Sequence, residues 1–294
     1  MTEPNGFPWI NPIGGYGDML MVSGVLKQVI EQDPKRRFNL VRRTKYLTVF
    51  TGHPGIATIG YPPKGARVQN VDYWAMEDLG PGEKRPMQVL ARAFGLSPPI
   101  EERLYFPPGI VEDPLLHGLL PWKEQNVLIA PASDSMRKVM HPSIWHRLVD
   151  LLLADGIRVM QLGRSREQHI RNCYSLLGLT SVAQAIALVA KADVVVTSDN
   201  FLMHAAWLCG TPAVVIWGPT RHEVYGYPGH VHIQMPKACR LGRWQDCVGP
   251  KHNNGGELYG TSCPEGERHC MDQAHPEEIY EGVREALANG RPGA

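Results

Sequence analysis

Apolar and polar positions along the first part of the chain follow the spacing of short strands and amphipathic helices. The periodic run at residues 19–32 places several aliphatic side chains on one broad face: Leu20, Val22, Val25, Leu26, Val29 and Ile30. Such a face predicts a helix. Over the first part of the chain the pattern predicts strands at 8–13, 38–41 and 68–74 and helices at 19–32 and 85–96, with Gly95 marking the end of the second helix.

The pattern is more regular in the second half. Ser181 and Gln184 have the form of a capping box that opens a helix reaching Lys191. Near-continuous valines before Thr197 predict a buried strand. The complete prediction is strands at 127–130, 157–162, 193–197 and 213–217, and helices at 144–152, 167–177, 181–191, 200–209 and 276–288.

Strands that alternate with helices at this spacing predict an α/β fold of parallel sheets covered on both faces. Two doubly wound units in tandem account for the length of 294 residues. We expect a first unit at 1–120, a second at 121–275 and a terminal helix with its tail at 276–294. Six prolines in residues 97–126 favour a linker there. Ligands in such sheets bind beyond the carboxyl ends of the strands, which selects the residues to inspect.

Composition narrows the function classes. Lys+Arg is 30 and Asp+Glu is 29, a net charge of +1, whereas nucleic-acid or membrane-surface binders show a basic excess. No stretch approaches the ~18 uninterrupted apolar residues of a membrane span. The first residues show neither a basic start nor an apolar signal core. We expect a cytoplasmic protein, with peripheral contact at the inner membrane left open.

The first candidate motif is Gly14-Gly15-Tyr16-Gly17-Asp18, at a predicted strand-to-helix turn. Gly15 and Gly17 let backbone approach a ligand, and a helix N-terminus favours anions. The spacing is not the full G-x-G-x-x-G, so a nicotinamide site is not indicated. Asp18 has two interpretations: a helix-capping carboxylate, the commoner role, or a general base at the edge of a cleft.

Two further candidates follow predicted strands. Residues 131–138 carry Ser133 and Lys138, a hydroxyl and a cation that suit a phosphate, although a solvated basic loop is equally consistent. Residues 197–204 pass from a valine-rich strand through Asp199 and Asn200 into a helix, with His204 one turn inside. A lone histidine there is more often structural, but the neighbouring aspartate favours a site. Gly218, after the next strand, lies at the same predicted edge.

Four of the six cysteines fall within one stretch rich in Gly, Pro and His: Cys239, Cys247, Cys263 and Cys270. Their spacing lacks the C-x2-C pairs of zinc ribbons. In a reducing compartment, clustered cysteines more often bind metal than form disulfides. A structural iron or zinc ion is the favoured interpretation, with unligated thiols and a disulfide as the alternatives.

These blocks, in this order, resemble glycosyltransferase family 9, the ADP-heptose:lipopolysaccharide heptosyltransferases and their relatives. The best-matching part runs from Leu179 to Gly229. There a helix and an apolar strand lead into Asp199 and, five residues later, His204, followed by Gly210-Thr-Pro and the strand that ends in Trp-Gly-Pro-Thr220. The family shows D-(S/T)-G-x-x-H at the first position and (F/Y)-G-P-T at the second. The resemblance covers most of residues 9–235.

The resemblance implies a GT-B architecture, with two Rossmann-like domains facing a cleft, and an inverting transfer from a nucleotide-sugar donor, ADP-heptose first. It gives Asp18 the role of base toward the acceptor hydroxyl. Lys138 becomes a donor-phosphate contact, with Ser133 nearby. Asp199 and His204 border the donor sugar and its diphosphate, together with the N–H groups of residues 200–202. Glu167 becomes a ribose contact.

The implied cellular role is lipopolysaccharide biosynthesis, with a saccharide or protein as acceptor and no cofactor required for catalysis. A homo-oligomer is left open, and some relatives carry a cysteine-bound metal near the C-terminus. Two positions depart from the family pattern: Asn200 follows the aspartate, and Phe201 stands where the family has glycine. Phe201 and the short first domain motivate one alternative, a non-catalytic nucleotide-sugar binder or scaffold on the same fold. A second alternative is a nucleotide-sugar epimerase of the same architecture.

Overall fold

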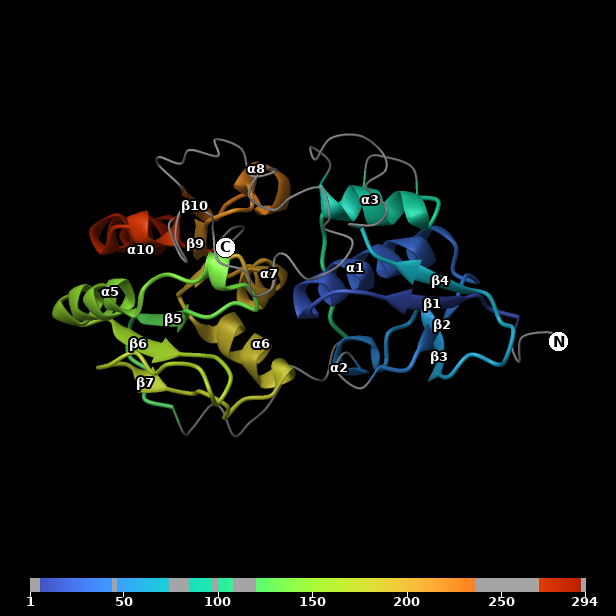
Figure 1. The fold of residues 1–294 in the computed structure, drawn as a ribbon, viewed down its shortest axis with the longest axis horizontal. Helices are drawn as coiled ribbons and strands as arrows, with labels where there is room; N and C mark the ends of the chain where they lie inside the picture. The colour runs from blue at the N-terminus through green and yellow to red at the C-terminus, as the bar shows by residue number, and fades with distance from the viewer. Residues whose placement is uncertain are drawn as a thin grey trace. The chain divides into compact units, whose positions relative to one another are not determined.

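The computed structural model describes residues 6–43, 47–73, 85–96, 100–107, 120–235 and 270–291. The chain forms two compact units, Met1–Ile110 and Val111–Ala294, drawn from blue to green and from green to red in Figure 1. The division falls inside the proline-rich segment 97–126. Within the described residues no helix is both long and apolar enough to cross a bilayer.

The first unit is built on a parallel sheet with the strand order β3-β2-β1-β4. Its strands are β1 (Trp9–Pro12), β2 (Phe38–Val41), β3 (Ile56–Gly60) and β4 (Val68–Val71), and its helices are α1 (Tyr16–Gln32), α2 (Leu47–Phe50) and α3 (Pro86–Ala93). The predicted strands at 8–13, 38–41 and 68–74 and helices at 19–32 and 85–96 are thereby confirmed, with slightly different ends. The sequence pattern did not reveal β3 or α2.

Helix α1 packs within the interior of the first unit, where most of its residues are buried. Gly24 is required there, because a Cβ at this position would lie 2.1 Å from the carbonyl oxygen of Arg103. The Gln28 side chain holds the same segment by bonding the backbone oxygen of Glu101 at 2.9 Å and its N–H at 3.2 Å. The helix is therefore held against the segment 101–104, and it also packs against α2, α3 and β1.

His53 is a core histidine of the first unit, with only 2% of its surface exposed. Its Nδ1 accepts from the N–H of Gly55 at 2.9 Å, so Nε2 carries the proton and donates to the carbonyl of Ser23 at 3.0 Å. Burial lowers the pKa of His53 to about 4, and the charge of Lys27 adds to this lowering. The ring is therefore neutral at pH 7, and both of its nitrogens contact backbone groups of the core.

The stability of the first unit is expected to fall as the pH drops from 6.5 to about 4. In this window the unfolded chain binds a proton at His53 that the folded chain does not bind, so the free energy of unfolding decreases by up to about 1.4 kcal/mol per pH unit, about 3 kcal/mol in all. His53→Gln should remove this part of the dependence. Urea unfolding of both proteins from pH 7.5 to 4 measures it. A difference in stability between them that does not change with pH contradicts the assignment.

The second unit is a six-stranded parallel sheet with the order β10-β9-β8-β5-β6-β7. Its strands are β5 (Asn126–Ala130), β6 (Arg158–Gln161), β7 (Tyr174–Ser175), β8 (Val194–Ser198), β9 (Ala213–Trp217) and β10 (Val231–Gln234). Its α-helices are α5 (Pro142–Ala154), α6 (Val182–Lys191), α7 (Phe201–Cys209), α8 (His222–Tyr225) and α10 (Pro276–Asn289), with 3-10 turns η2 (Met136–Lys138) and η4 (Met271–Gln273). The α/β prediction of parallel sheets is confirmed.

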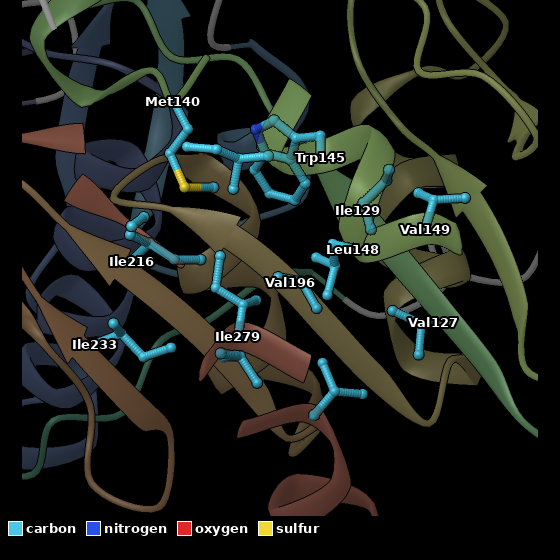
Figure 2. Close-up of a cluster of buried hydrophobic side chains, with 14 of the residues drawn as sticks. Val127, Ile129, Met140, Trp145, Leu148, Val149, Val196, Ile216, Ile233 and Ile279 are labelled. Atoms are coloured by element: carbon cyan, nitrogen blue, oxygen red, sulfur yellow. The ribbon is translucent and has the colours of Figure 1, made fainter. Parts of the chain in front are cut away.

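A hydrophobic core of the second unit lies where α5 and α10 cover one face of this sheet. Figure 2 shows Trp145 and Leu148 of α5 and Ile279 of α10 over strand residues such as Val196 and Ile216, all of them buried. Because burial of apolar surface contributes about 25 cal/mol per Å², this cluster stabilises the unit. The terminal helix, predicted at 276–288, is a part of this core.

The predicted helix at 167–177 is wrong. Residues 166–173 form turns and irregular backbone that lead into the short edge strand β7. The buried side chain of Gln161 takes the place of helical hydrogen bonds, because its Oε1 accepts from the N–H of Ile170 and its Nε2 donates to the carbonyl of Gln168, both at 2.8 Å. Asn172 has a φ of 64°, a left-handed conformation that no helix interior accommodates.

Candidate functional site

The strand order of the second unit changes direction between β5 and β8. From β5 the chain proceeds to β6 and β7 on one side, and from β8 to β9 and β10 on the other. In open parallel sheets ligands bind beyond the carboxyl ends of the strands at such a switch point. Lys138 follows β5, Asp199 follows β8 and Thr220 follows β9, so each of the three lies after the carboxyl end of a central strand.

The three side chains contact one another. The Nζ atom of Lys138 lies 2.6 Å from Oδ2 of Asp199, and the hydroxyl of Thr220 donates to the same oxygen at 2.6 Å. The Lys138 and Asp199 side chains are 15% and 13% exposed. Burial acts to raise the pKa of Asp199, but the charge of Lys138 and the two hydrogen bonds outweigh it and hold this pKa below its ordinary value. The carboxylate is therefore ionised and fixes the lysine at the sheet edge.

Asn200 is the N-cap of α7. Its Oδ1 accepts from the N–H of Leu202 at 2.9 Å, while its Nδ2 donates to the carbonyls of Ala132 at 2.8 Å and Ala130 at 3.3 Å. One side chain thus joins the ends of β5 and β8 across the switch point. Among the backbone groups of residues 200–202 predicted to face a phosphate, the N–H of Leu202 is already bonded to this cap. A single hydroxyl would not supply both the cap and the two donated bonds.

His204 lies one turn inside α7 and contacts an aromatic residue that the sequence reasoning missed. Its Nδ1 is 2.7 Å from the hydroxyl of Tyr227, and the two rings meet edge to face at 5.6 Å. Burial lowers the pKa of His204 to about 4; the charge of Asp199 acts against this lowering and that of Lys138 adds to it. The imidazole is therefore neutral at pH 7 and within the electrostatic range of both charged residues.

Gly218 is needed for packing at this edge. A Cβ there would lie 2.7 Å from the sulfur of Met271 and 3.2 Å from the carbonyl oxygen of Arg137. The glycine therefore lets η2 pack closely against the end of β9. Since Lys138 is the last residue of η2, Gly218 helps to set the position of the lysine.

Ser133 and Glu167 make contacts of their own in the same unit. The hydroxyl of Ser133 accepts from the N–H of Ser135 at 3.4 Å. Glu167, whose side chain is 14% exposed, pairs with Arg164 at 2.9 Å, and Arg164 reaches Asp134 at 2.6 Å. The ion pair between Arg164 and Asp134 joins the loops that follow β5 and β6. The predicted roles of both residues toward a donor stay predictions.

Asp18 is a helix-capping residue of the first unit. It is the third residue of α1, and its Oδ2 accepts from the N–H of Gly15, the N-cap, at 2.5 Å. Gly14 makes room for it, because a Cβ there would lie 2.3 Å from that oxygen and the φ of 132° favours glycine. Gly17 is buried in the first turn. The capping interpretation is confirmed for the Asp18 side chain, which stays half-buried at the helix start.

Three of the predicted metal ligands, Cys239, Cys247 and Cys263, lie outside the described residues. Cys270 is described, and it is 7% exposed within the core beside η4. In the ranges that the structure describes, no three or more His, Cys, Asp or Glu side chains gather closely enough to hold a metal ion. The prediction of a cysteine-bound metal therefore stays a prediction.

The structure thus brings Lys138, Asp199 and Thr220 together, with Asn200 as the N-cap of α7 and His204 one turn inside that helix. Thr220 ends the Trp-Gly-Pro-Thr segment that carries part of the family resemblance, but it was not among the predicted site residues. Tyr227 and Trp207 were missed altogether. The spacing of three residues between His204 and Trp207 on one helix was a weak signal, whereas nothing in the sequence links His204 to Tyr227, 23 residues away.

Comparison with known families gives a match at residues 111–239 to glycosyltransferase family 9 (heptosyltransferase). Among characterised proteins, lipooligosaccharide heptosyltransferase 2 of Haemophilus influenzae is 28% identical over 87 residues, which is 25% of the length of either protein. The chain therefore spans a quarter of the length of the relatives that it matches by sequence. The resemblance to glycosyltransferase family 9 is confirmed.

Solved structures share the fold over nearly the whole chain. The ADP-heptose lipopolysaccharide heptosyltransferase II of Escherichia coli superposes with a TM-score of 0.68 at 13% identity, covering 96% of this chain and 99% of that one. The iron-containing dodecameric glycosyltransferase TibC of enterotoxigenic E. coli gives 0.71 at 14% identity, covering 96% of this chain and 76% of that one. TibC has also been solved with ADP-D-beta-D-heptose. At these identities the likeness establishes the fold.

Proposed function

We propose that this glycosyltransferase family 9-like chain is an inverting glycosyltransferase that moves a sugar, heptose first, from a nucleoside-diphosphate donor to an acceptor hydroxyl. The observation that carries the proposal is the contact of Lys138, Asp199 and Thr220 at the switch point of the second sheet. Support comes from the family match at residues 111–239 and from heptosyltransferases with the same fold.

The second unit has the chemistry to hold a diphosphate. Cleavage of the bond between sugar and phosphate builds negative charge on the leaving nucleoside diphosphate. An ammonium group has three donors, so Lys138 can keep its bond to Asp199 and still donate to a phosphate oxygen. The N-terminus of α7 adds positive potential at the same edge. Because Asp199 and Thr220 fix the lysine before the donor arrives, little reorganisation is needed during the reaction.

Asp18 is proposed as the general base. The acceptor oxygen bonds to the anomeric carbon while the bond from that carbon to the phosphate oxygen breaks, and the hydroxyl proton passes to the carboxylate. Attack from the face opposite the leaving group inverts the configuration. The bond from Gly15 engages Oδ2 of Asp18. A carboxylate has four lone-pair sites on its two oxygens, so capping and proton transfer are compatible.

The remaining parts of the proposal concern partners. The acceptor is a saccharide or a protein, and the proposed setting is lipopolysaccharide biosynthesis at the cytoplasmic side of the inner membrane. Assembly into a homo-oligomer belongs to the same proposal, because TibC, which shares this fold, is dodecameric.

Thermal denaturation in the presence of nucleotide sugars tests the proposal. A ligand that binds only the native state raises its stability by about 2.7 kcal/mol at 100 times Kd. We expect ADP-heptose and ADP to raise the midpoint and UDP-glucose to raise it less. Release of ADP with candidate acceptors then measures transfer. The absence of any shift with nucleoside diphosphates contradicts the proposal. Binding without turnover favours the scaffold alternative, and conversion of the donor without acceptor favours the epimerase.

A structural metal held by Cys239, Cys247, Cys263 and Cys270 is also proposed, because four thiolates suit iron or zinc. The buried position of Cys270 beside the core fits a structural rather than a catalytic ion. Elemental analysis of the purified protein is expected to find about one such ion per chain, and Cys270→Ser is expected to lower this content. Cys173→Ser, which changes a half-buried thiol elsewhere, is the matched control. A folded, metal-free protein refutes the metal site.

A further inference from the structure

Tyr227 is held in place from two directions. Its ring is 3% exposed and stacks on Trp207 of α7, with ring centroids 5.2 Å apart and planes 6° from parallel. Its backbone carbonyl accepts from Nε2 of His232 at 3.0 Å. The direction of this bond is known because Nδ1 of His232 accepts at 3.0 Å from the indole of Trp217, which is a donor only. The phenol is therefore presented to His204 by ring stacking and by backbone.

The bond between Tyr227 and His204 has a preferred direction. His204 is neutral at pH 7 because burial lowers its pKa to about 4, so one ring nitrogen is an acceptor and the other carries the proton. A phenol is a much stronger acid than a neutral imidazole N–H, so the phenol is the better donor in this pair. At 2.7 Å the hydroxyl of Tyr227 donates to Nδ1, which leaves the proton of His204 on Nε2.

We infer that Tyr227 is a positioning residue that holds His204 as the Nε2–H tautomer, so that the ring acts as a neutral hydrogen-bond donor toward an anionic group beside Lys138 and Asp199. The inference rests on the proposed function for its ligand, a nucleoside diphosphate. A neutral N–H donor suits this edge, because it adds a hydrogen bond to an anion without adding a charge that Asp199 would attract. The second nitrogen of a histidine ring commonly sets the state of the first in this way.

The tautomer is measured directly in the unliganded protein. With ¹⁵N-labelled histidine in the full chain, protonated and unprotonated ring nitrogens resonate in separate ranges, and His204→Gln assigns the signals among the 12 histidines. We expect wild-type His204 at pH 7 to carry its proton on Nε2 and Tyr227→Phe to give a mixture of both tautomers. This variant keeps the ring that stacks on Trp207. A proton on Nδ1 in the wild type, or an unchanged tautomer in Tyr227→Phe, overturns the inference.

Binding of ADP to the same proteins separates this inference from the proposed function. Tyr227→Phe is expected to weaken ADP binding about fivefold to tenfold, since a tautomer mixture and a less ordered ring cost roughly one hydrogen bond. Tyr225→Phe, which removes the hydroxyl of another buried tyrosine two residues earlier, should stay within about twofold. If the wild type binds no nucleoside diphosphate, the proposed function fails while the tautomer is still decided by NMR. If ADP binds and Tyr227→Phe binds it equally well, the positioning role fails alone.

Discussion

Turnover of Asp18→Asn is expected to be about 10²–10⁴-fold below that of the wild type, with nearly unchanged donor affinity. The amide keeps an oxygen that can accept from the N–H of Gly15, so the helix cap survives. What the substitution removes is the ability to take up a proton. Steady-state release of ADP, with donor and acceptor at saturation, measures the effect. Unreduced turnover in Asp18→Asn assigns the residue to capping alone.

Asp18→Ala separates the two roles of this carboxylate. Loss of the capping bond is expected to cost about 1 kcal/mol of stability in the first unit, whereas Asp18→Asn should cost less. Both variants should lose turnover to a similar extent, because neither has a base at this position. If turnover followed stability across the two variants, the base assignment would be replaced by an indirect structural effect.

The sequence predicted an element correctly where residues within that element determine its limits and burial. The capping box of Ser181 and Gln184 opens α6 as predicted, with both of its hydrogen bonds in place. Gly210 ends α7 in a left-handed conformation. The central strands β8 and β9 are buried on both faces, so their continuous valines and other apolar residues identify them.

The sequence failed where a distant side chain decides the backbone. Residues 167–177 have helical spacing, but Gln161 on β6 satisfies the backbone of 168 and 170 from outside, and this bond depends on tertiary packing. The edge strand β3 was missed because its residues are mostly half-buried or exposed and show no strong apolar run. Dependence on a distant side chain also limited the prediction of the site. Lys138, Asp199 and His204 follow from strand ends and the family pattern, whereas Tyr227 reaches His204 from a loop.

Lys138→Met is expected to weaken ADP binding about 10- to 100-fold, because a charge-assisted hydrogen bond to the diphosphate is lost. Turnover should fall further, since the lysine also stabilises the leaving group. Isothermal titration with ADP and steady-state kinetics measure the two effects. Lys191→Met, which removes a cation that lies over Trp122 in the same unit, is a control for the loss of charge alone. Equal ADP affinity in Lys138→Met and the wild type excludes Lys138 from the donor site.

The same variant leaves Asp199 mostly buried, with the hydroxyl of Thr220 still donating to its Oδ2, and the expected stability cost is about 3 kcal/mol at pH 7. The double variant Lys138→Met/Asp199→Asn removes both charges and should recover most of this cost. It is also expected to bind ADP as weakly as Lys138→Met, because stability is restored but the cation is not. Recovery of ADP affinity in the double variant would show that the single variant had lost binding through local unfolding.

The stability cost of Lys138→Met is expected to depend on pH. In the wild type Lys138 holds the pKa of Asp199 below its ordinary value, so the pair stabilises the fold above about pH 4, and this contribution is lost as the pH falls through the lowered pKa. Without the lysine, burial is the dominant influence and raises that pKa above the unfolded value. The destabilisation by Lys138→Met should then be small near pH 4 and grow as the pH rises, because the folded chain keeps a proton on Asp199 that the unfolded chain has already released. The double variant, which has no carboxylate at position 199, should show a constant difference from the wild type over the upper part of this range. A Lys138→Met cost that is the same at pH 4.5 and pH 7.5 would mean that the buried pair does not couple the two residues.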